Sequence, residues 1–177
     1  MHIRTATTDD LARITAIYAH HVLHGTGTFE TTPPSEVEMA SRHADVAAKG
    51  LPYLVAEASG QVMGFAYANW FKPRPAYRFS AEDSIYVDPT QVHSGVGAAL
   101  LSELLTRLEG AGVRQVLAVI GDSGNLGSIK LHTKLGFNQI GVLPSVGWKF
   151  GRWLDVVMMQ KSIGEGGHTS PQNTDEI

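Results

Sequence analysis

Ser84-Ile85-Tyr86-Val87-Asp88 and, a few residues further on, Gly95-Val96-Gly97 form the stretch that decides the fold. The first part is rich in β-branched and aromatic residues and predicts a strand, and the run 98–108 after the glycines has the apolar spacing of a helix. In a strand, glycine loop and helix joined in this order, the N–H groups of the loop and the positive end of the helix dipole face the same point. The stretch therefore predicts a cradle for an anionic group.

A second motif follows, Asn125-x-x-Ser128-x-x-Leu131-His132-x-x-x-Gly136-Phe137. It predicts a short helix with Asn125 near its start and with Gly136 at the end, where a left-handed cap favours glycine. A glycine loop alone is more often an ordinary turn between a strand and a helix. The two motifs together, however, predict an enzyme that binds a cofactor through its pyrophosphate.

Periodic patterns elsewhere predict the remaining elements. Strands are expected at 2–6, 53–57, 61–69, 78–87, 116–120, 142–144 and 152–160, and helices at 11–23, 36–49, 98–108 and 125–135. Hairpins and crossovers both occur, which favours an α/β fold with a mixed sheet covered by helices. The length suits one domain, 1–163, and the polar tail 164–177 has so little to bury that we expect it to be disordered.

The composition excludes several classes of protein. Without cysteine the chain has no disulfide, no thiolate metal site and no cysteine nucleophile, and a reducing cytoplasm is the simplest location. A formal charge of −3 argues against nucleic acid as the main partner. No apolar run is long enough to span a bilayer, and Met1-His2-Ile3-Arg4 does not begin a signal peptide. The cluster His20, His21 and His24 lacks a fourth ligand nearby, so no metal site is predicted.

The two motifs resemble the acetyl-CoA-binding region of the GNAT superfamily of N-acetyltransferases, whose loop runs Gln/Arg-x-x-Gly-x-Gly/Ala after a central strand. The matching residues are Val92-His93-Ser94-Gly95-Val96-Gly97, with Val92 where Gln or Arg is usual. This departure removes one side-chain contact and leaves the backbone cradle intact. The resemblance implies a mostly antiparallel sheet with splayed central strands, flanked by helices, and acetyl-CoA as cosubstrate.

A closer resemblance is to the phosphinothricin and methionine sulfoximine/sulfone N-acetyltransferases. Four segments carry it: Ile17-Tyr18-x-x-His21-Val22 with Thr28-Phe29-Glu30-Thr31; Ala76-Tyr77-Arg78-x-x-x-Glu82-x-Ser84-Ile85-Tyr86-Val87; Leu131-His132-x-x-Leu135-Gly136-Phe137; and Val146-Gly147-Trp148-Lys149-Phe150-Gly151-Arg152-Trp153-Leu154-Asp155. The resemblance implies acetylation of the α-amino group of small amino-acid analogues. It also implies a homodimer with pockets near the subunit interface.

Glu82 is the predicted general base, because the family places its catalytic glutamate at this position. A carboxylate with an ordinary pKa of about 4.3 must be partly buried, or act through water, to remove a proton from an ammonium group. The alternative is a solvated glutamate at a sheet edge. Asp83 points to the opposite face of the strand and is the weaker candidate.

His132 is the second predicted catalytic residue. It stands where many members of the superfamily carry a tyrosine that protonates the departing thiolate. An imidazole with a pKa near 6.5 can donate or relay that proton. The alternative is a helix histidine that forms only local hydrogen bonds.

The residue chemistry and the resemblance together predict residues for the two substrates. The predicted acetyl-CoA contacts are Ile85, Tyr86, Val87, His93, Ser94, Gly95, Val96, Gly97, Ala98, Asn125 and Ser128. The predicted contacts of the amino-acid substrate are Phe29, Glu30, Arg74, Tyr77 and Arg78, since a guanidinium binds a carboxylate or phosphinate bidentately. Helix capping is the alternative for Asn125, and core packing for Phe29. The late residues Lys149, Arg152, Trp153 and Asp155 are expected to support the site and subunit contacts.

Three alternatives to this substrate class stay open. The amine can be another small molecule or a peptide N-terminus, or the chain can be a non-catalytic acetyl-CoA-binding regulatory module. The presence of both Glu82 and His132 argues against the non-catalytic module. A dinucleotide-binding fold is excluded, because Leu100 stands at the last glycine of Gly-x-Gly-x-x-Gly.

Overall fold

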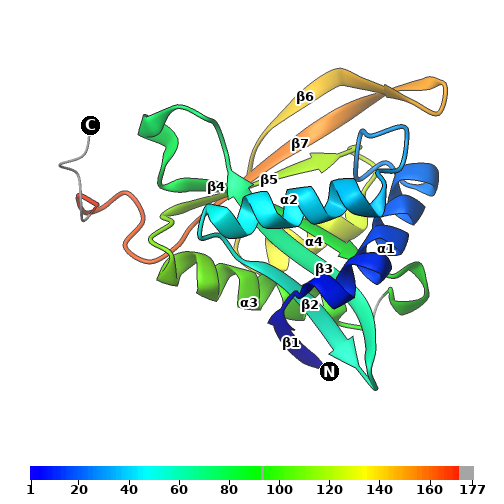
Figure 1. Cartoon of the computed structure of the whole chain (residues 1–177). Coiled ribbons are helices and arrows are strands. Elements are labelled where there is room, and N and C mark those ends of the chain that lie inside the picture. Colours follow the sequence, from blue (N-terminus) through cyan, green and yellow to red (C-terminus); the bar gives the residue numbers. More distant parts are fainter. Residues whose placement is uncertain (93, 172–177) are drawn as a thin grey trace.

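The computed structural model describes residues 1–92 and 94–171, and it confirms the expected mixed α/β fold. Over these residues a seven-stranded sheet has the order β1-β2-β3-β4-β5-β7-β6 and is flanked by helices (Figure 1). The strands are β1 (His2–Thr5), β2 (Tyr53–Ala58), β3 (Gln61–Trp70), β4 (Ser80–Val87), β5 (Gln115–Gly121), β6 (Asn138–Lys149) and β7 (Arg152–Ser162). The helices are α1 (Leu11–His24), α2 (Glu36–Ala48), α3 (Val96–Gly110) and α4 (Leu126–Lys134).

The sheet divides between its two central strands. Neighbouring strands are antiparallel except β4 and β5, which run parallel because α3 crosses between them. The β4–β5 ladder ends where Asp83 lies opposite Ala118, whereas β4 stays paired with β3 as far as Val87 and β5 stays paired with β7 as far as Gly121. The ends of β4 and β5 therefore diverge. In the described part of the chain, residues 84–87 have no strand on their β5 side.

Helices cover both faces of the sheet. Phe65 of β3 contacts Tyr18 of α1, with ring centroids 6.4 Å apart, whereas a Cβ on the preceding Gly64 would lie 3.1 Å from Val96 of α3. Because successive strand residues point to opposite faces, α1 and α3 lie on opposite faces. The helix α2 packs beside α1, and α4 packs against β5 and β6. The buried apolar side chains on both faces of the strands form the core.

Local signals fix the points at which the helices begin. Oγ of Ser35 accepts a hydrogen bond from the Glu38 N–H (3.2 Å) at the start of α2, and Oδ1 of Asn125 accepts one from the Ser128 N–H (3.2 Å) at the start of α4. Gly95 precedes α3 with a φ of +84°, a conformation that strains other residues. All four expected helices are present, with ends within two residues of those predicted.

The prediction for β6 was wrong in its extent. A strand was expected only at 142–144, yet β6 covers Asn138–Lys149 and includes Gly141, Pro144 and Gly147. It pairs with β7 along its length, with register shifts between residues 139 and 141 and between 143 and 147. Such bulges accommodate glycine and proline without ending a strand. The hairpin of β6 and β7 extends beyond the rest of the sheet (Figure 1).

The first part of the C-terminal tail makes contacts with the domain. Arg114 donates a hydrogen bond to Oγ1 of Thr169 (3.2 Å) and forms an ion pair with Glu165 (3.6 Å). Residues 172–177 lie outside the described residues, as does His93 of the predicted phosphate loop. The domain boundary after residue 163 stays a prediction. Within the described ranges, no helix combines the length and the apolar character needed to cross a bilayer.

Candidate active site

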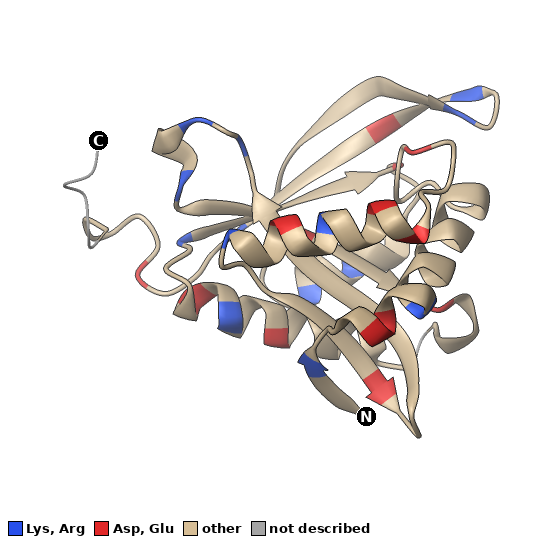
Figure 2. Cartoon of the chain, in the orientation of Figure 1, with Lys and Arg blue, Asp and Glu red and all other residues tan. Residues whose placement is uncertain are grey.

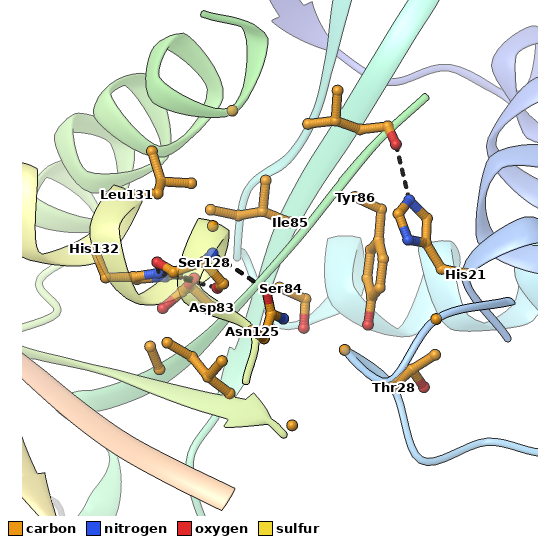
Figure 3. Close-up of a pocket in the computed structure, with 18 of the residues that line it drawn as sticks. His21, Thr28, Asp83, Ser84, Ile85, Tyr86, Asn125, Ser128, Leu131 and His132 are labelled. Atoms are coloured by element: carbon orange, nitrogen blue, oxygen red, sulfur yellow. Dashed lines mark hydrogen bonds and ion pairs between the residues drawn. The ribbon is translucent and has the colours of Figure 1, made fainter. Parts of the chain in front are cut away.

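A cavity of about 980 Å³ opens where β4 and β5 diverge. Figure 3 shows Asp83, Ser128 and His132 on one side of it and Thr28 and Tyr86 on the other. The predicted site residues that line it are Phe29, Glu82, Ile85, Tyr86, Val87, Gly95, Val96, Gly97, Ala98, Asn125, Ser128 and His132. Both sequence motifs and the loop after α1 therefore meet at one site.

The start of α3 forms the anion-binding end of the cavity. The first hydrogen bond of the helix runs from the Ala99 N–H to the Gly95 carbonyl (3.1 Å), so the N–H groups before Ala99 have no acceptor within the helix. Gly97 lies close to its neighbours, since a Cβ there would be 3.3 Å from Leu131. Free N–H groups and the positive end of the helix dipole suit this end to a phosphate.

The open edge of β4 forms the middle of the cavity. Residues 84–87 keep β3 on one side, and an open edge offers N–H and C=O groups to an extended ligand. Nε2 of His21 donates a hydrogen bond to the Val87 carbonyl (2.8 Å), which fixes the end of the edge. Burial lowers the pKa of His21 despite this hydrogen bond, so its imidazole is neutral at pH 7. His21 was part of the family motif and was not predicted as a site residue.

Glu82 lies at the base of the cavity, one residue before the last pair of the β4–β5 ladder. Burial raises its pKa, and the charge of Asp83 raises it further, against the smaller effect of Lys72. Among the described residues, no ion pair holds its carboxylate. A half-buried carboxylate with a raised pKa and free oxygens has the properties of a general base.

His132 is held at both ring nitrogens. Nδ1 lies 2.8 Å from the Ser128 carbonyl, and Nε2 lies 3.0 Å from Oδ2 of Asp83. His132 is 3% exposed and Asp83 is 7% exposed. Burial lowers the pKa of His132, but the hydrogen bond and the charge of Asp83 outweigh it, so the net shift is upward. Sequence reasoning ranked Asp83 low because it points away from Glu82, and that direction is the one that brings it to α4.

The loop 25–30 forms the wall of the cavity opposite α4, and residues of β5 and β6 hold it in place. The buried Lys149 donates from Nζ to the carbonyls of Gly25 and Thr28, both at 2.8 Å. The ring of Phe29 packs between two glycines, because a Cβ at Gly121 would lie 2.9 Å from it and a Cβ at Gly147 would lie 2.2 Å from it. Lys149 was expected to support the site, and its contacts fix the loop that lines the cavity.

Some predicted residues lie outside the cavity lining. Glu30 accepts hydrogen bonds from Arg42 (2.6 Å) and Tyr18 (2.8 Å), which outweigh burial and lower its pKa, so it is an ion-paired carboxylate. The β3–β4 loop projects from the sheet and carries several basic residues (Figure 2). The predicted residues outside the lining are Ser94, Glu30 and, on that loop, Arg74, Tyr77 and Arg78. The described chain therefore does not bring the predicted arginines to Glu82.

The cavity thus combines an anion cradle, an open strand edge and a carboxylate with a raised pKa. Among the described residues, no group of three or more His, Asp or Glu side chains is placed to hold a metal ion. A carrier bound through its phosphates and lying along the strand edge would present its far end to Glu82. The arrangement suits transfer of an acyl group from such a carrier to an amine.

Comparison with known proteins defines the class. The sequence pattern of the acetyltransferase (GNAT) domain matches residues 3–158. The chain belongs to this family, and it is an N-acetyltransferase, as its motifs predicted.

Individual relatives are similar over nearly the whole chain. A phosphinothricin N-acetyltransferase of Alcaligenes faecalis is 52% identical over 170 residues, which are 96% of this chain and 86% of that protein. An L-methionine sulfoximine/L-methionine sulfone acetyltransferase of Pseudomonas aeruginosa is 42% identical over 91% of this chain and 94% of that protein. The crystal structure of a GNAT superfamily phosphinothricin acetyltransferase from Sinorhizobium meliloti in complex with AcCoA has a TM-score of 0.95 and 47% identity, covering 98% of this chain and 94% of that one.

Proposed function

We propose that this chain transfers an acetyl group from acetyl-CoA to the α-amino group of phosphinothricin, methionine sulfoximine or methionine sulfone. The observation that carries the proposal is the junction of an anion cradle, an open strand edge and Glu82 in one cavity. The names of the relatives support the substrate class, because they include all three compounds. Acetylation removes the positive charge of the amine, so we expect it to detoxify these amino-acid analogues.

The cavity suits acetyl-CoA at each of its parts. The N–H groups at the start of α3 would bind the pyrophosphate, and the open edge at 84–87 would bind the amide groups of the pantetheine arm as an added strand. Gly97 keeps this approach open, since a larger side chain would crowd Leu131. The remaining end of the cavity, between Glu82 and His132, would hold the thioester.

Glu82 and His132 divide the proton transfers of the reaction. Glu82 takes a proton from the amine, directly or through water, so that neutral nitrogen attacks the thioester carbonyl. Burial raises the pKa of Glu82, which makes it a stronger base than an exposed glutamate. His132 gives a proton to the departing sulfur. Arg74 and Arg78 are the candidates for binding the acidic groups of the substrate. This role requires the β3–β4 loop to approach the cavity.

We also propose that the chain is a cytoplasmic homodimer. The β6–β7 hairpin exposes more than half the surface of Val146, Trp148, Phe150 and Trp153. Exposed aromatic side chains gathered in this way are typical of a surface that another protein covers. A second copy on this hairpin would shield the loop 25–30, which Lys149 ties to β6. The absence of cysteine supports a reducing compartment.

A thiol-release assay with acetyl-CoA tests the proposed reaction. Purified protein is offered phosphinothricin, methionine sulfoximine, methionine sulfone, a polyamine and an N-terminal peptide side by side. Selective turnover of the first three supports the proposal, whereas turnover of only the polyamine or the peptide rejects the substrate class. Absence of any turnover, with acetyl-CoA still bound, favours the non-catalytic module.

The variant Glu82→Gln tests the base. We expect kcat to fall by about 10²–10⁴-fold, with acetyl-CoA binding unchanged, because the amide cannot take a proton. Glu103→Gln is the matched control, since Glu103 pairs with Arg107 on the outer surface of α3 (2.8 Å). Equal kcat values for the two variants would remove Glu82 from the mechanism.

A further inference from the structure

The carboxylate of Asp83 has no role in the proton transfers described above, yet it is buried in the wall of the cavity. Its Oδ2 lies 3.0 Å from Nε2 of His132, and its Oδ1 is buried without a hydrogen-bond partner among the described residues. Burying a carboxylate is costly unless it is paired. The side chain of His132 is the partner that compensates for this burial.

The acceptors around His132 determine how many protons its ring carries. The Ser128 carbonyl can only accept, so Nδ1 of His132 carries a hydrogen. Nε2 faces a carboxylate oxygen, and two lone pairs that face each other at 3.0 Å repel, so in the resting state a second proton lies between Nε2 and Oδ2 of Asp83. An ionised Asp83 then requires His132 to be an imidazolium. The Asp83–His132 pair therefore holds one proton more than a pair of a neutral histidine and an ionised carboxylate would hold.

The other charged groups near the pair do not replace Asp83. Glu82 is the neighbouring carboxylate on β4, and Lys130 and Lys134 on α4 are exposed to solvent. The neighbours of the pair on the remaining elements are Ala118 of β5, opposite Asp83 in the ladder, and Phe137, whose ring packs edge-on against His132 at 4.9 Å. Neither of these two side chains titrates. The protonation of His132 therefore depends on Asp83.

We propose that Asp83 is a positioning residue of the acetyl transfer, which keeps His132 doubly protonated and its ring fixed against α4 so that a proton is held for the departing sulfur. This role rests on the proposed function. It explains why a carboxylate lies beside the base on the opposite face of β4. It also gives Asp83 an effect on the reaction without contact between its side chain and the acetyl group.

The proton balance of the step is complete. As the bond between the acetyl carbon and sulfur breaks, sulfur keeps the electron pair and His132 gives it the proton from Nε2. The ring is left neutral, with its remaining hydrogen on Nδ1 facing the Ser128 carbonyl. The lone pair of Nε2 then faces the ionised Asp83, and their repulsion lasts only until a proton from solvent returns to the position between the two atoms. Glu82 releases to solvent the proton that it took from the amine.

Nitrogen-15 NMR of the histidine rings tests the protonation state on the whole protein. At pH 7 we expect both ring nitrogens of His132 to be protonated in the wild type, and only Nδ1 to be protonated in Asp83→Asn, whose amide can donate to Nε2. The signals are assigned by their loss in His132→Gln. Asp45→Asn is the matched control, because Asp45 pairs with Lys49 on the surface of α2 at 2.5 Å. A single ring proton in the wild type at pH 7 would overturn the proposal, and this measurement needs no variant to fold.

Kinetics separate a role in the reaction from a purely structural one. With the amine that the wild type acetylates, we expect Asp83→Asn to lower kcat at pH 8 by about tenfold to 100-fold, with the KM for acetyl-CoA changed by less than about twofold. The alkaline limb of kcat against pH should move to lower pH, because an imidazolium without the charge of Asp83 beside it loses its second proton more easily. An unchanged profile in Asp83→Asn would overturn the positioning role, even with the NMR result as expected.

Failure of the proposed function is distinguishable from failure of this inference. Absence of turnover by the wild type with every amine would reject the proposed function and, with it, the role of Asp83 in acetyl transfer. The protonation state of His132 would still be decided by NMR. Turnover with a normal pH profile in Asp83→Asn would reject the role of Asp83 and leave the proposed function intact.

Discussion

Replacing Gly147 by alanine is expected to displace Phe29 and, through it, the wall of the cavity. A Cβ at residue 147 would lie 2.2 Å from Cε2 of the Phe29 ring and 2.5 Å from Cδ2, whereas ordinary contact begins at 3.4 Å. The ring must therefore move by about 1 Å to restore normal contact distances. Its opposite edge is also close to a neighbour, because a Cβ at Gly121 would lie 2.9 Å from Cε1. The ring has little room to move, so the whole loop 25–30 must shift.

The expected cost follows from this crowding. Overpacking a well-packed site costs about 1–3 kcal/mol in the free energy of unfolding. Phe29 lines the cavity, and a displacement of about 1 Å in a positioning group can reduce a rate by about 100-fold. We expect kcat/KM for the amine to fall by between about tenfold and 100-fold. The KM for acetyl-CoA should stay unchanged, because the cradle is formed by the backbone at the start of α3 and not by the loop 25–30.

The assay compares two alanine substitutions on the same strand. Urea unfolding gives the change in stability, and steady-state kinetics give kcat/KM for the amine. Gly141→Ala is the control, because a Cβ at residue 141 meets no atom within 4 Å and the backbone there does not have a positive φ. Equal unfolding free energies and equal kcat/KM values in Gly147→Ala and Gly141→Ala would refute the reasoning.

A double-mutant cycle assigns the cost to the ring. In a Phe29→Ala background, Gly147→Ala should cost almost nothing, because the added methyl group then enters space that the ring has left. The expected coupling energy is about 1–3 kcal/mol. A full cost in the Phe29→Ala background would show that the strain arises in the backbone of β6.

Two further predictions concern stability. Hydrogen bonds from Arg4 lower the pKa of Asp10 despite its burial. Asp10 therefore stabilises the fold fully above its unfolded pKa of about 3.9. It loses this contribution as the pH falls through its lower folded pKa. Asp10→Asn should cost about 1–3 kcal/mol at pH 7 in urea unfolding, and the difference from the wild type should shrink below about pH 4; a difference that grows in acid would contradict the assignment. Lys149→Met should lower the free energy of unfolding by about 1–3 kcal/mol, because two carbonyls lose their donor while the cost of burying the ammonium is relieved. Lys49→Met on the surface should lower it by less than about 0.5 kcal/mol. Equal losses for the two lysine variants would show that Lys149 does not hold the loop.

Sequence patterns were sufficient where the structure depends on local interactions. Asn125 caps the helix that it was expected to begin, and Ser35 caps the helix expected at 36–49, since capping needs only residues a few positions apart. The apolar spacing after Gly97 predicted α3, because that spacing places one face of a helix against the sheet. The extent of β6 could not be predicted in this way. Gly141 and Pro144 carry the signal of a turn, and only pairing with β7 keeps them in a strand.

The candidate site shows the same division. Residues at the start of α3 and along β4 were predicted because a short motif contains the whole cradle. Arg78 matched the family pattern and Arg74 was chosen for its guanidinium group, but the distance of both from the cavity depends on how the β3–β4 loop packs. The ion pair of Glu30 with Arg42 likewise joins a loop to a helix that share no sequence pattern.

The sequence by itself determined the class of protein, the helices and the anion cradle, because each depends on residues close together in the chain or on a motif of fixed spacing. Tertiary structure alone decided that Asp83 meets His132 across 49 positions, that Lys149 reaches the carbonyl of Thr28 across 121, and that Phe29 packs between two glycines from β5 and β6. These contacts depend on the divergence of β4 and β5 and on the course of the β6–β7 hairpin. Such long-range geometry is set by the packing of the whole sheet, which no local pattern encodes.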